Sequence, residues 1–225
     1  SVCLCYRGCW YQICGTYLMA NYIFVDFDGP LLPGKMHLFD ANRKAVAAFM
    51  AGEDVMPIFD PAAVQMHNLW AKHGNAKVVF STSWARHVRT WQETEAYLKR
   101  VMRYNGYTGE FADDCVTPKR RSSSHIHEIQ EWCYDNLKPE DRFIAVDDAD
   151  LSFLANDQCS WHAQARWIQC NYNDGLTWKN FQDGCEWLQV DKPSMLHIEY
   201  GIVPKSEEEI KRERELFERV GYALF

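Results

Sequence analysis

The sequence predicts an α/β fold of three layers, in which helices cover both faces of a doubly wound, mainly parallel sheet. Two observations predict it: short apolar runs recur along the chain, and helical patterns separate them. Short runs without polar alternation are typical of strands that are buried on both faces. The composition agrees, because 47% of the 225 residues are hydrophobic and 24% are charged, as in globular chains and unlike disordered ones.

Four strands are expected, and each is a run of mainly apolar residues. They lie at Tyr22–Phe27, Lys77–Phe80, Arg142–Val146 and Arg166–Cys170. Because helical segments separate these runs, the strands are expected to pair in parallel within one sheet. The carboxyl ends of such strands form the edge where open α/β sheets bind ligands.

Capping residues and apolar spacing mark the helices between these strands. Asp60 followed by Pro61 predicts the start of a helix over Ala62–His73, which Gly74 ends. Thr177 is the expected cap of a helix that runs to Leu188. One further helix is indicated by apolar residues at three- and four-residue spacing after the serines at 122–124: Ile126, Ile129, Cys133 and Leu137.

The chain is expected to form one domain with two appendages. Met19 precedes a strong strand, so residues 1–18 are interpreted as an N-terminal extension outside the fold, followed by a domain over 19–190. The remaining residues, 191–225, are interpreted as a tail. Within it, Ser206 and Glu209 form a capping box for an amphipathic helix.

Net charge, cysteine content and hydropathy limit the partners and the cellular compartment that are expected for the protein. The net charge of −7 excludes general electrostatic attraction of nucleic acid by the whole molecule, so any such affinity must be local. The nine cysteines show no C-x-x-C spacing of a zinc site; four lie in the first eighteen residues, and the scatter of the other five favours a reducing, cytoplasmic compartment. No apolar run approaches the roughly 18 residues of a membrane-spanning helix, so no membrane partner is expected.

Two pairs of acidic residues follow predicted strands. Asp26 and Asp28, with Gly29 after them, lie at the end of the first strand, and Asp147 and Asp148 follow the third. Either pair alone is explained by helix capping, which favours Asp. Burying several carboxylates together requires a cation, and a hard divalent metal prefers oxygen ligands. Two acid pairs at one edge of the sheet therefore predict a metal site.

Hydroxyl and basic residues complete this edge. Thr82 and Ser83 follow the second strand, where a hydroxyl can donate to a phosphoryl oxygen, and Lys119 precedes a helix. His125 and His127 are two residues apart on a helix and cannot face the same ligand, so they are interpreted as surface residues.

These residues resemble the four ordered motifs of the haloacid dehalogenase (HAD) superfamily. The resemblance covers roughly Tyr22 to Leu188 and implies a Rossmann-like, HAD-like fold. Only 56 positions separate the first two motifs, fewer than a cap domain of roughly a hundred residues needs. A capless or minimally capped member with a small helical insertion and an open site is therefore expected. The motif residues, in chain order, are Asp26, Asp28, Thr82, Lys119, Asp147 and Asp148.

The resemblance also implies a mechanism. In such a phosphohydrolase Asp26 attacks phosphorus and becomes an aspartyl phosphate, while Asp28 protonates the leaving group and then activates water. Mg²⁺ would be held by Asp26, Asp28 and one or both of Asp147 and Asp148. The phosphoryl oxygens would be bound by Thr82, Ser83 and Lys119, where a neighbouring arginine at 120 or 121 is an alternative to the lysine.

The run Thr82-Ser83-Trp84 resembles 5′-nucleotidases and the phosphatase-like domains associated with nucleic-acid end repair. A phosphorylated substrate, either a nucleotide or a nucleic-acid terminal phosphate, is therefore expected. Four aromatic residues near a basic stretch are candidates for base stacking, although packing against the sheet is the commoner use of such residues: Trp84, Trp91, Tyr104 and Tyr107.

Two other functions stay open. A non-catalytic HAD-fold binding protein is disfavoured because both Asp26 and Asp28 are present. A phosphotransferase would use the same residues with an acceptor other than water. The sequence predicts no oligomeric state.

Overall fold

A computed structural model describes most of the chain: residues 2–6, 9–13, 19–51, 53, 55–86, 91–118, 125–150 and 165–190. Near the N-terminus, β1 (Val2–Tyr6) pairs antiparallel with β2 (Cys9–Ile13). Whether residues 1–18 lie outside the fold stays a prediction, and the expected tail helix falls outside the described residues.

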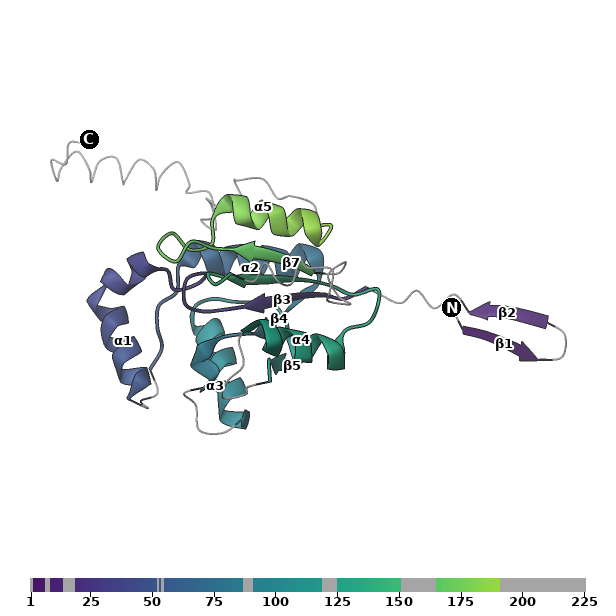
Figure 1. Cartoon of the computed structure of the whole chain (residues 1–225), viewed down its shortest axis with the longest axis horizontal. Helices are drawn as coiled ribbons and strands as arrows, with labels where there is room; N and C mark the ends of the chain where they lie inside the picture. Colours follow the sequence, from purple (N-terminus) through teal and green to yellow (C-terminus); the bar gives the residue numbers. More distant parts are fainter. Residues whose placement is uncertain are drawn as a thin grey trace, which may run out of the picture. The chain divides into compact units, whose positions relative to one another are not determined.

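The centre of the domain is a five-stranded sheet whose strands are all parallel, in the order β5-β4-β3-β6-β7 (Figure 1). This arrangement confirms the predicted doubly wound α/β fold. The chain order reverses direction at β3, so β3 and its neighbours provide the switch point at which such sheets bind ligands. The bounds are β3 (Asn21–Val25), β4 (Ala76–Phe80), β5 (Phe111–Val116), β6 (Arg142–Asp147) and β7 (Ala165–Gln169).

The three expected helices that fall within the described residues are present, with ends close to the predicted ones. The Asp60 side chain accepts a hydrogen bond from the Ala62 amide, as an N-cap should, and Thr177 forms a full capping box with Asn180. The bounds are η1 (Gly34–Leu38), α1 (Asp40–Met50), α2 (Pro61–Gly74), η2 (Ser83–Arg86), α3 (Trp91–Tyr104), α4 (His125–Asn136) and α5 (Trp178–Trp187).

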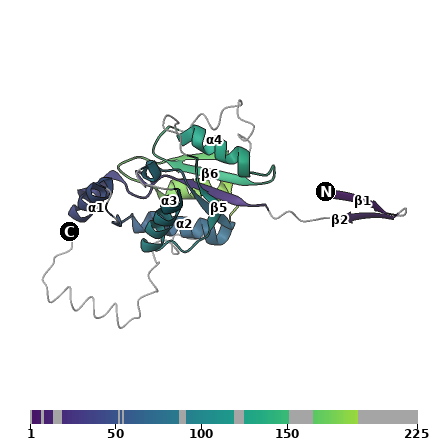
Figure 2. The same cartoon turned by 90° about the horizontal axis from the view of Figure 1, so that it is seen from below.

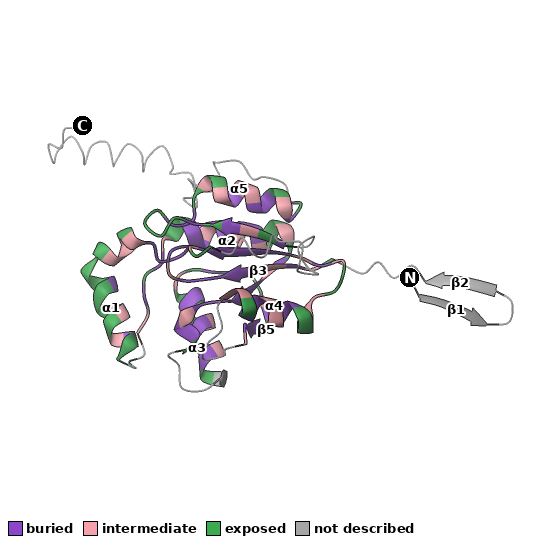
Figure 3. Cartoon of the chain, viewed as in Figure 1, coloured by how far each residue is buried: buried purple, intermediate pink, exposed green. Residues whose placement is uncertain are grey.

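Helices cover the sheet on both faces, with α5 and α4 on opposite sides (Figure 1). Helix α2 lies with α5, because Trp70 packs on Phe181 with ring centroids 5.2 Å apart. On the α4 side, the Trp132 ring meets Tyr22 and Phe24 edge to face, each at 5.1 Å. Large aromatic rings thus fill both interfaces between helix and sheet, and the buried residues gather along the strands (Figure 3).

The insertion between the first two motifs is small and helical, and consists of η1 and α1. Figures 1 and 2 place α1 beyond the carboxyl ends of the strands, at one side of the sheet. It is fixed there by Phe49, whose ring stacks on Trp84 at 4.5 Å and on Tyr97 at 5.0 Å. A helix therefore stands beside the site edge without forming a cap domain.

Candidate active site

The first acid pair lies where β3 ends. The strand stops at Val25 and not at the predicted Phe27, and the Asp26 amide still donates to the Val146 carbonyl of β6 at 3.1 Å. Asp26 is 4% exposed, and its Oδ1 accepts a hydrogen bond of 2.7 Å from the Phe27 amide. The nucleophile candidate is thus held rigidly by the end of the central strand.

Asp28 lies in the turn that follows and not on an extended strand. It forms an isolated bridge with Leu32, and its Oδ2 accepts a hydrogen bond of 2.9 Å from the Trp84 indole nitrogen. Trp84 is itself 3% exposed, so its ring fixes the direction of the Asp28 carboxyl group.

The second acid pair lies at the end of β6, against the turn that carries the first. Asp147 is 2% exposed, and Asp148 is partly exposed. Gly29 has φ +81°, and a Cβ added there would lie 2.6 Å from the Cβ of Asp148. Glycine is therefore required twice over, by its left-handed backbone and by the close approach of Asp148.

His125, the first residue of α4, belongs to this cluster. Its Nδ1 lies 2.8 Å from Oδ2 of Asp147, and its side chain is only 18% exposed. Its interpretation as a surface residue is therefore wrong, although His127 is exposed. Two-residue spacing on a helix excludes a ligand shared by the two histidines, but it does not exclude a partner such as Asp147 on a strand.

The cluster is electrostatically costly in the absence of a cation. Burial, together with the nearby Asp147 carboxylate, raises the pKa of Asp26 well above its ordinary value, against the lowering effect of His125 and of a hydrogen bond with Thr82. Burial and Asp147 also raise the pKa of Asp148. For His125, burial opposes the charged ring, but the hydrogen bond to Asp147 and the Asp26 charge outweigh it and raise its pKa.

These residues fit a divalent cation. Asp26, His125 and Asp147 each offer one ligand atom, and these atoms all lie within 4.8 Å of one another. Buried carboxylates whose pKa is raised are the groups that a positive charge would stabilise most. The two carboxylates provide the hard oxygen ligands that Mg²⁺ prefers.

The three predicted phosphate-binding residues differ in what the structure says of them. Thr82 is fully buried and hydrogen-bonds to Asp26, and Ser83, which begins η2, is partly exposed. Both follow β4 at the same edge as the acids. Lys119 and its two arginine neighbours lie outside the described residues.

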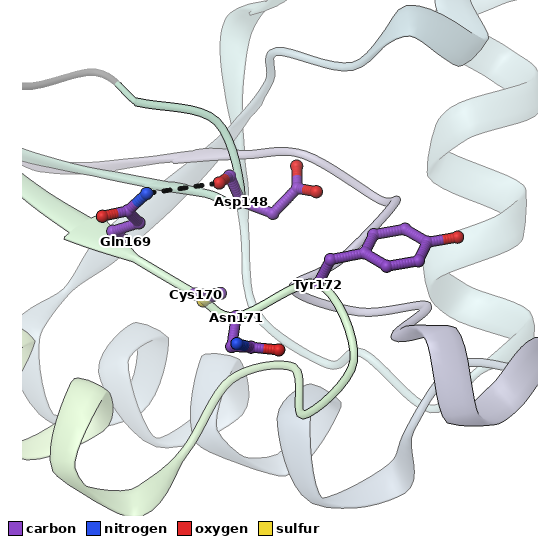
Figure 4. Close-up of a pocket in the computed structure, with 5 residues that line it drawn as sticks. All are labelled: Asp148, Gln169, Cys170, Asn171 and Tyr172. Atoms are coloured by element: carbon purple, nitrogen blue, oxygen red, sulfur yellow. Dashed lines mark hydrogen bonds between the residues drawn. The ribbon is translucent and has the colours of Figure 1, made fainter.

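A pocket of about 430 Å³ adjoins the acids (Figure 4). Its lining comes from the residue after β6, from the last residue of β7 and from the segment that follows β7: Asp148, Gln169, Cys170, Asn171 and Tyr172. No sequence motif marked Tyr172, whose ring is 46% exposed. Of the aromatic residues considered for stacking, Trp84 and Tyr107 are buried at 3% and 1% exposure, so they pack in the core.

A family model described as the HAD domain in Swiss Army Knife RNA repair proteins matches residues 22–181. The match runs from β3 into α5 and includes both acid pairs and Thr82. No curated protein and no solved structure matched the chain. Among the described residues, none of the helices is long and apolar enough to cross a bilayer.

Proposed function

The chain belongs to the family of HAD domains in Swiss Army Knife RNA repair proteins, and from this premise we propose that it is a Mg²⁺-dependent phosphatase. Its substrate would be a nucleotide or a nucleic-acid terminal phosphate, and its intermediate an aspartyl phosphate. One observation carries the proposal: Asp26 is buried at the end of the central strand beside Asp147, where an ionised nucleophile needs a cation.

Asp26 would act as the nucleophile. One of its carboxylate oxygens attacks phosphorus while the bond from phosphorus to the leaving oxygen breaks. The Phe27 amide donates to Oδ1 and so orients the carboxylate for attack. Burial excludes bulk water, which strengthens each electrostatic contact with the transferred group.

Asp28 would act as general acid and then as general base. It gives its proton to the leaving oxygen, and afterwards takes a proton from the water that attacks the aspartyl phosphate, which releases phosphate and restores Asp26. The hydrogen bond from Trp84 to Oδ2 orients the Asp28 carboxyl group for both proton transfers. Trp84 is thus a positioning residue.

Mg²⁺ would be held by Asp26, by the main-chain carbonyl of Asp28 and by one or both of Asp147 and Asp148. When bound, it supplies positive charge that offsets the carboxylates and the phosphate. His125 would keep Asp147 in place through its hydrogen bond of 2.8 Å, as residues behind metal ligands commonly do.

The phosphoryl oxygens would be bound by Thr82, Ser83 and Lys119, with His125 as a further nearby cation. We also propose that the active domain is confined to residues 19–190. A reducing, cytoplasmic setting is supported by the four described cysteines outside the N-terminal hairpin, which are buried as free thiols: Cys115, Cys133, Cys170 and Cys185.

The test is phosphate release from aryl phosphate, nucleoside 5′- and 3′-monophosphates and oligonucleotides with terminal phosphates, in Mg²⁺ or in EDTA. We expect release in Mg²⁺ that EDTA abolishes and that Asp26→Ala lowers by at least about a thousandfold, as loss of a nucleophile does. Asp135→Asn, an exposed carboxylate on α4, is the control that should keep full activity. Release in Asp26→Ala near the wild-type level would refute the nucleophile, and phosphate on a non-water acceptor would identify a transferase.

A further inference from the structure

We propose that the pocket beside the acids binds the nucleoside that carries the scissile phosphate, with its base stacked on Tyr172. This inference rests on the proposed phosphatase function and names the part of the substrate that the site recognises. The pocket shares Asp148 with the acid cluster, so we assign a phosphate at Asp26 and a nucleoside in the pocket to one substrate molecule. Its volume of about 430 Å³ lies in the range of small-ligand sites.

The aromatic ring of Tyr172 lines the pocket, and its contacts restrict the direction in which it points. The ring is 46% exposed, and it stacks on His37 with centroids 6.3 Å apart and an interplanar angle of 18°. The Tyr172 carbonyl accepts a hydrogen bond of 2.7 Å from the Gly34 amide. Because these contacts restrict the ring and its main chain, stacking a base would cost little further ordering of the protein.

The loop that carries the ring is fixed at its other end as well. Oδ1 of Asn171 accepts hydrogen bonds from the amides of Asn173 and Asp174, at 2.8 and 3.4 Å. The Lys35 ammonium group donates to the Asp174 carbonyl at 3.1 Å. The segment after β7 is therefore bound to the segment after the nucleophile turn, which holds Tyr172 in register with the acids.

The charge of the pocket selects the uncharged part of a nucleotide. Figure 4 shows the Asp148 carboxylate and the Tyr172 ring extending in the same direction, away from Gln169. The five residues that line the pocket include no lysine or arginine, so a run of phosphates would find no basic partner among them, whereas oxygen acceptors suit sugar hydroxyls and base amino groups. The amides of Gln169 and Asn171 add uncharged polar groups to the lining. The pocket therefore fits a base and its ribose, and not a run of phosphates.

The test compares ligands with and without a base. Binding of adenosine 5′- and 3′-monophosphate and of ribose 5-phosphate is measured by calorimetry in Mg²⁺ on Asp26→Asn, and turnover of the same compounds on the active chain. From the usual strength of base stacking on an aromatic side chain, we expect Tyr172→Ala to weaken the binding of one nucleotide roughly 5- to 150-fold. Ribose 5-phosphate should be unaffected, and Tyr172→Phe should retain nucleotide affinity. Tyr134→Ala, which removes a tyrosine that is 80% exposed on α4, is the matched control.

Each outcome decides between the two proposals. Equal affinity for nucleotide and ribose phosphate, or equal losses for both in Tyr172→Ala, would overturn the nucleoside pocket. Tighter binding of a phosphoserine peptide than of either nucleotide would overturn it as well. Nucleotide binding that depends on Tyr172, without turnover of any compound, would instead refute the phosphatase and leave the pocket standing.

Discussion

Replacing the buried Asp26 with asparagine should stabilise the metal-free protein while it abolishes activity. Asparagine keeps the oxygen that accepts from the Phe27 amide and removes the charge that Asp147 repels. Burial and Asp147 raise the pKa of Asp26 from 3.8 to about 8. Only the part of this shift that lies below the assay pH of 7 affects stability in the assay. At about 1.4 kcal/mol per pKa unit, that part lowers the free energy of unfolding of wild type by at most about 4 kcal/mol, and Asp26→Asn should recover up to this amount.

The sign of the pH dependence follows from the direction of the shift. Because the pKa of Asp26 is higher in the folded than in the unfolded chain, its contribution to stability is fully present below pH 4 and is lost as the pH rises toward 8. The free energy of unfolding of metal-free wild type should therefore fall across this window. Asp26→Asn should lack this part of the fall, so the advantage of the variant should grow with pH.

Urea denaturation followed by tryptophan fluorescence measures both effects, at pH 5, 7 and 8, in EDTA and in Mg²⁺. Mg²⁺ should stabilise wild type more than Asp26→Asn, since the variant has lost a ligand. Asp135→Asn removes an exposed carboxylate of the same fold and should change neither the stability nor its pH dependence by more than about 0.5 kcal/mol. If metal-free Asp26→Asn is no more stable than metal-free wild type at pH 8, then the buried Asp26 carboxylate does not destabilise the fold, and the proposed stabilisation by a cation is refuted.

Two further changes test the geometry of the turn. Trp84→Phe removes the indole donor to Asp28 but keeps an aromatic ring against Phe49 of the insertion. For alkyl phosphates, whose leaving oxygen needs the proton of Asp28, kcat should fall roughly 10- to 100-fold. For an aryl phosphate, whose leaving group needs no proton, kcat should fall much less. Equal losses for both substrates would remove Trp84 from the acid step. Gly29→Ala should lower the free energy of unfolding more than Gly106→Ala does, because both glycines have positive φ but only an added Cβ at Gly29 would meet Asp148. Gly106→Ala should cost about 1 to 2 kcal/mol from backbone strain alone. Equal losses of stability in the two variants would show that the approach of Asp148 is not tight.

The fold was predictable because its central strands are buried on both faces and read as apolar runs. The strand missed by sequence reasoning, β5, pairs only with β4 at the edge of the sheet. Its two acidic residues, Asp113 and Asp114, are exposed, so no apolar run marks it. A small helical insertion was expected, but the sequence did not mark the bounds of its helix α1, for a related reason. Of its residues only Asn42 and Phe49 are buried, too few for a helical period, and the Asn42 side chain fixes the helix through hydrogen bonds to the main chain of Ile58.

The candidate site was predictable where chemistry follows a strand directly, and not where partners come from separate elements. Both acid pairs and Thr82 follow strands that the sequence marks clearly. His125 begins a helix, and only the sheet order, which puts β6 next to β3, brings it to Asp147 and Asp26. His127, two residues further along the helix, is exposed. The sequence pattern alone does not show which of the two histidines faces the acids.

Sequence reasoning placed its candidate base-stacking residues in a different segment from Tyr172, the residue proposed above. It favoured aromatics near basic residues, yet Trp84 and Tyr107 are needed in the core. Tyr172 lies in an acidic and polar stretch, but it follows the last parallel strand, β7, three residues after Gln169. A position just beyond the carboxyl end of a strand lies at the ligand-binding edge whatever its local composition. The proposed nucleoside pocket therefore follows from sheet topology and not from charge near an aromatic residue.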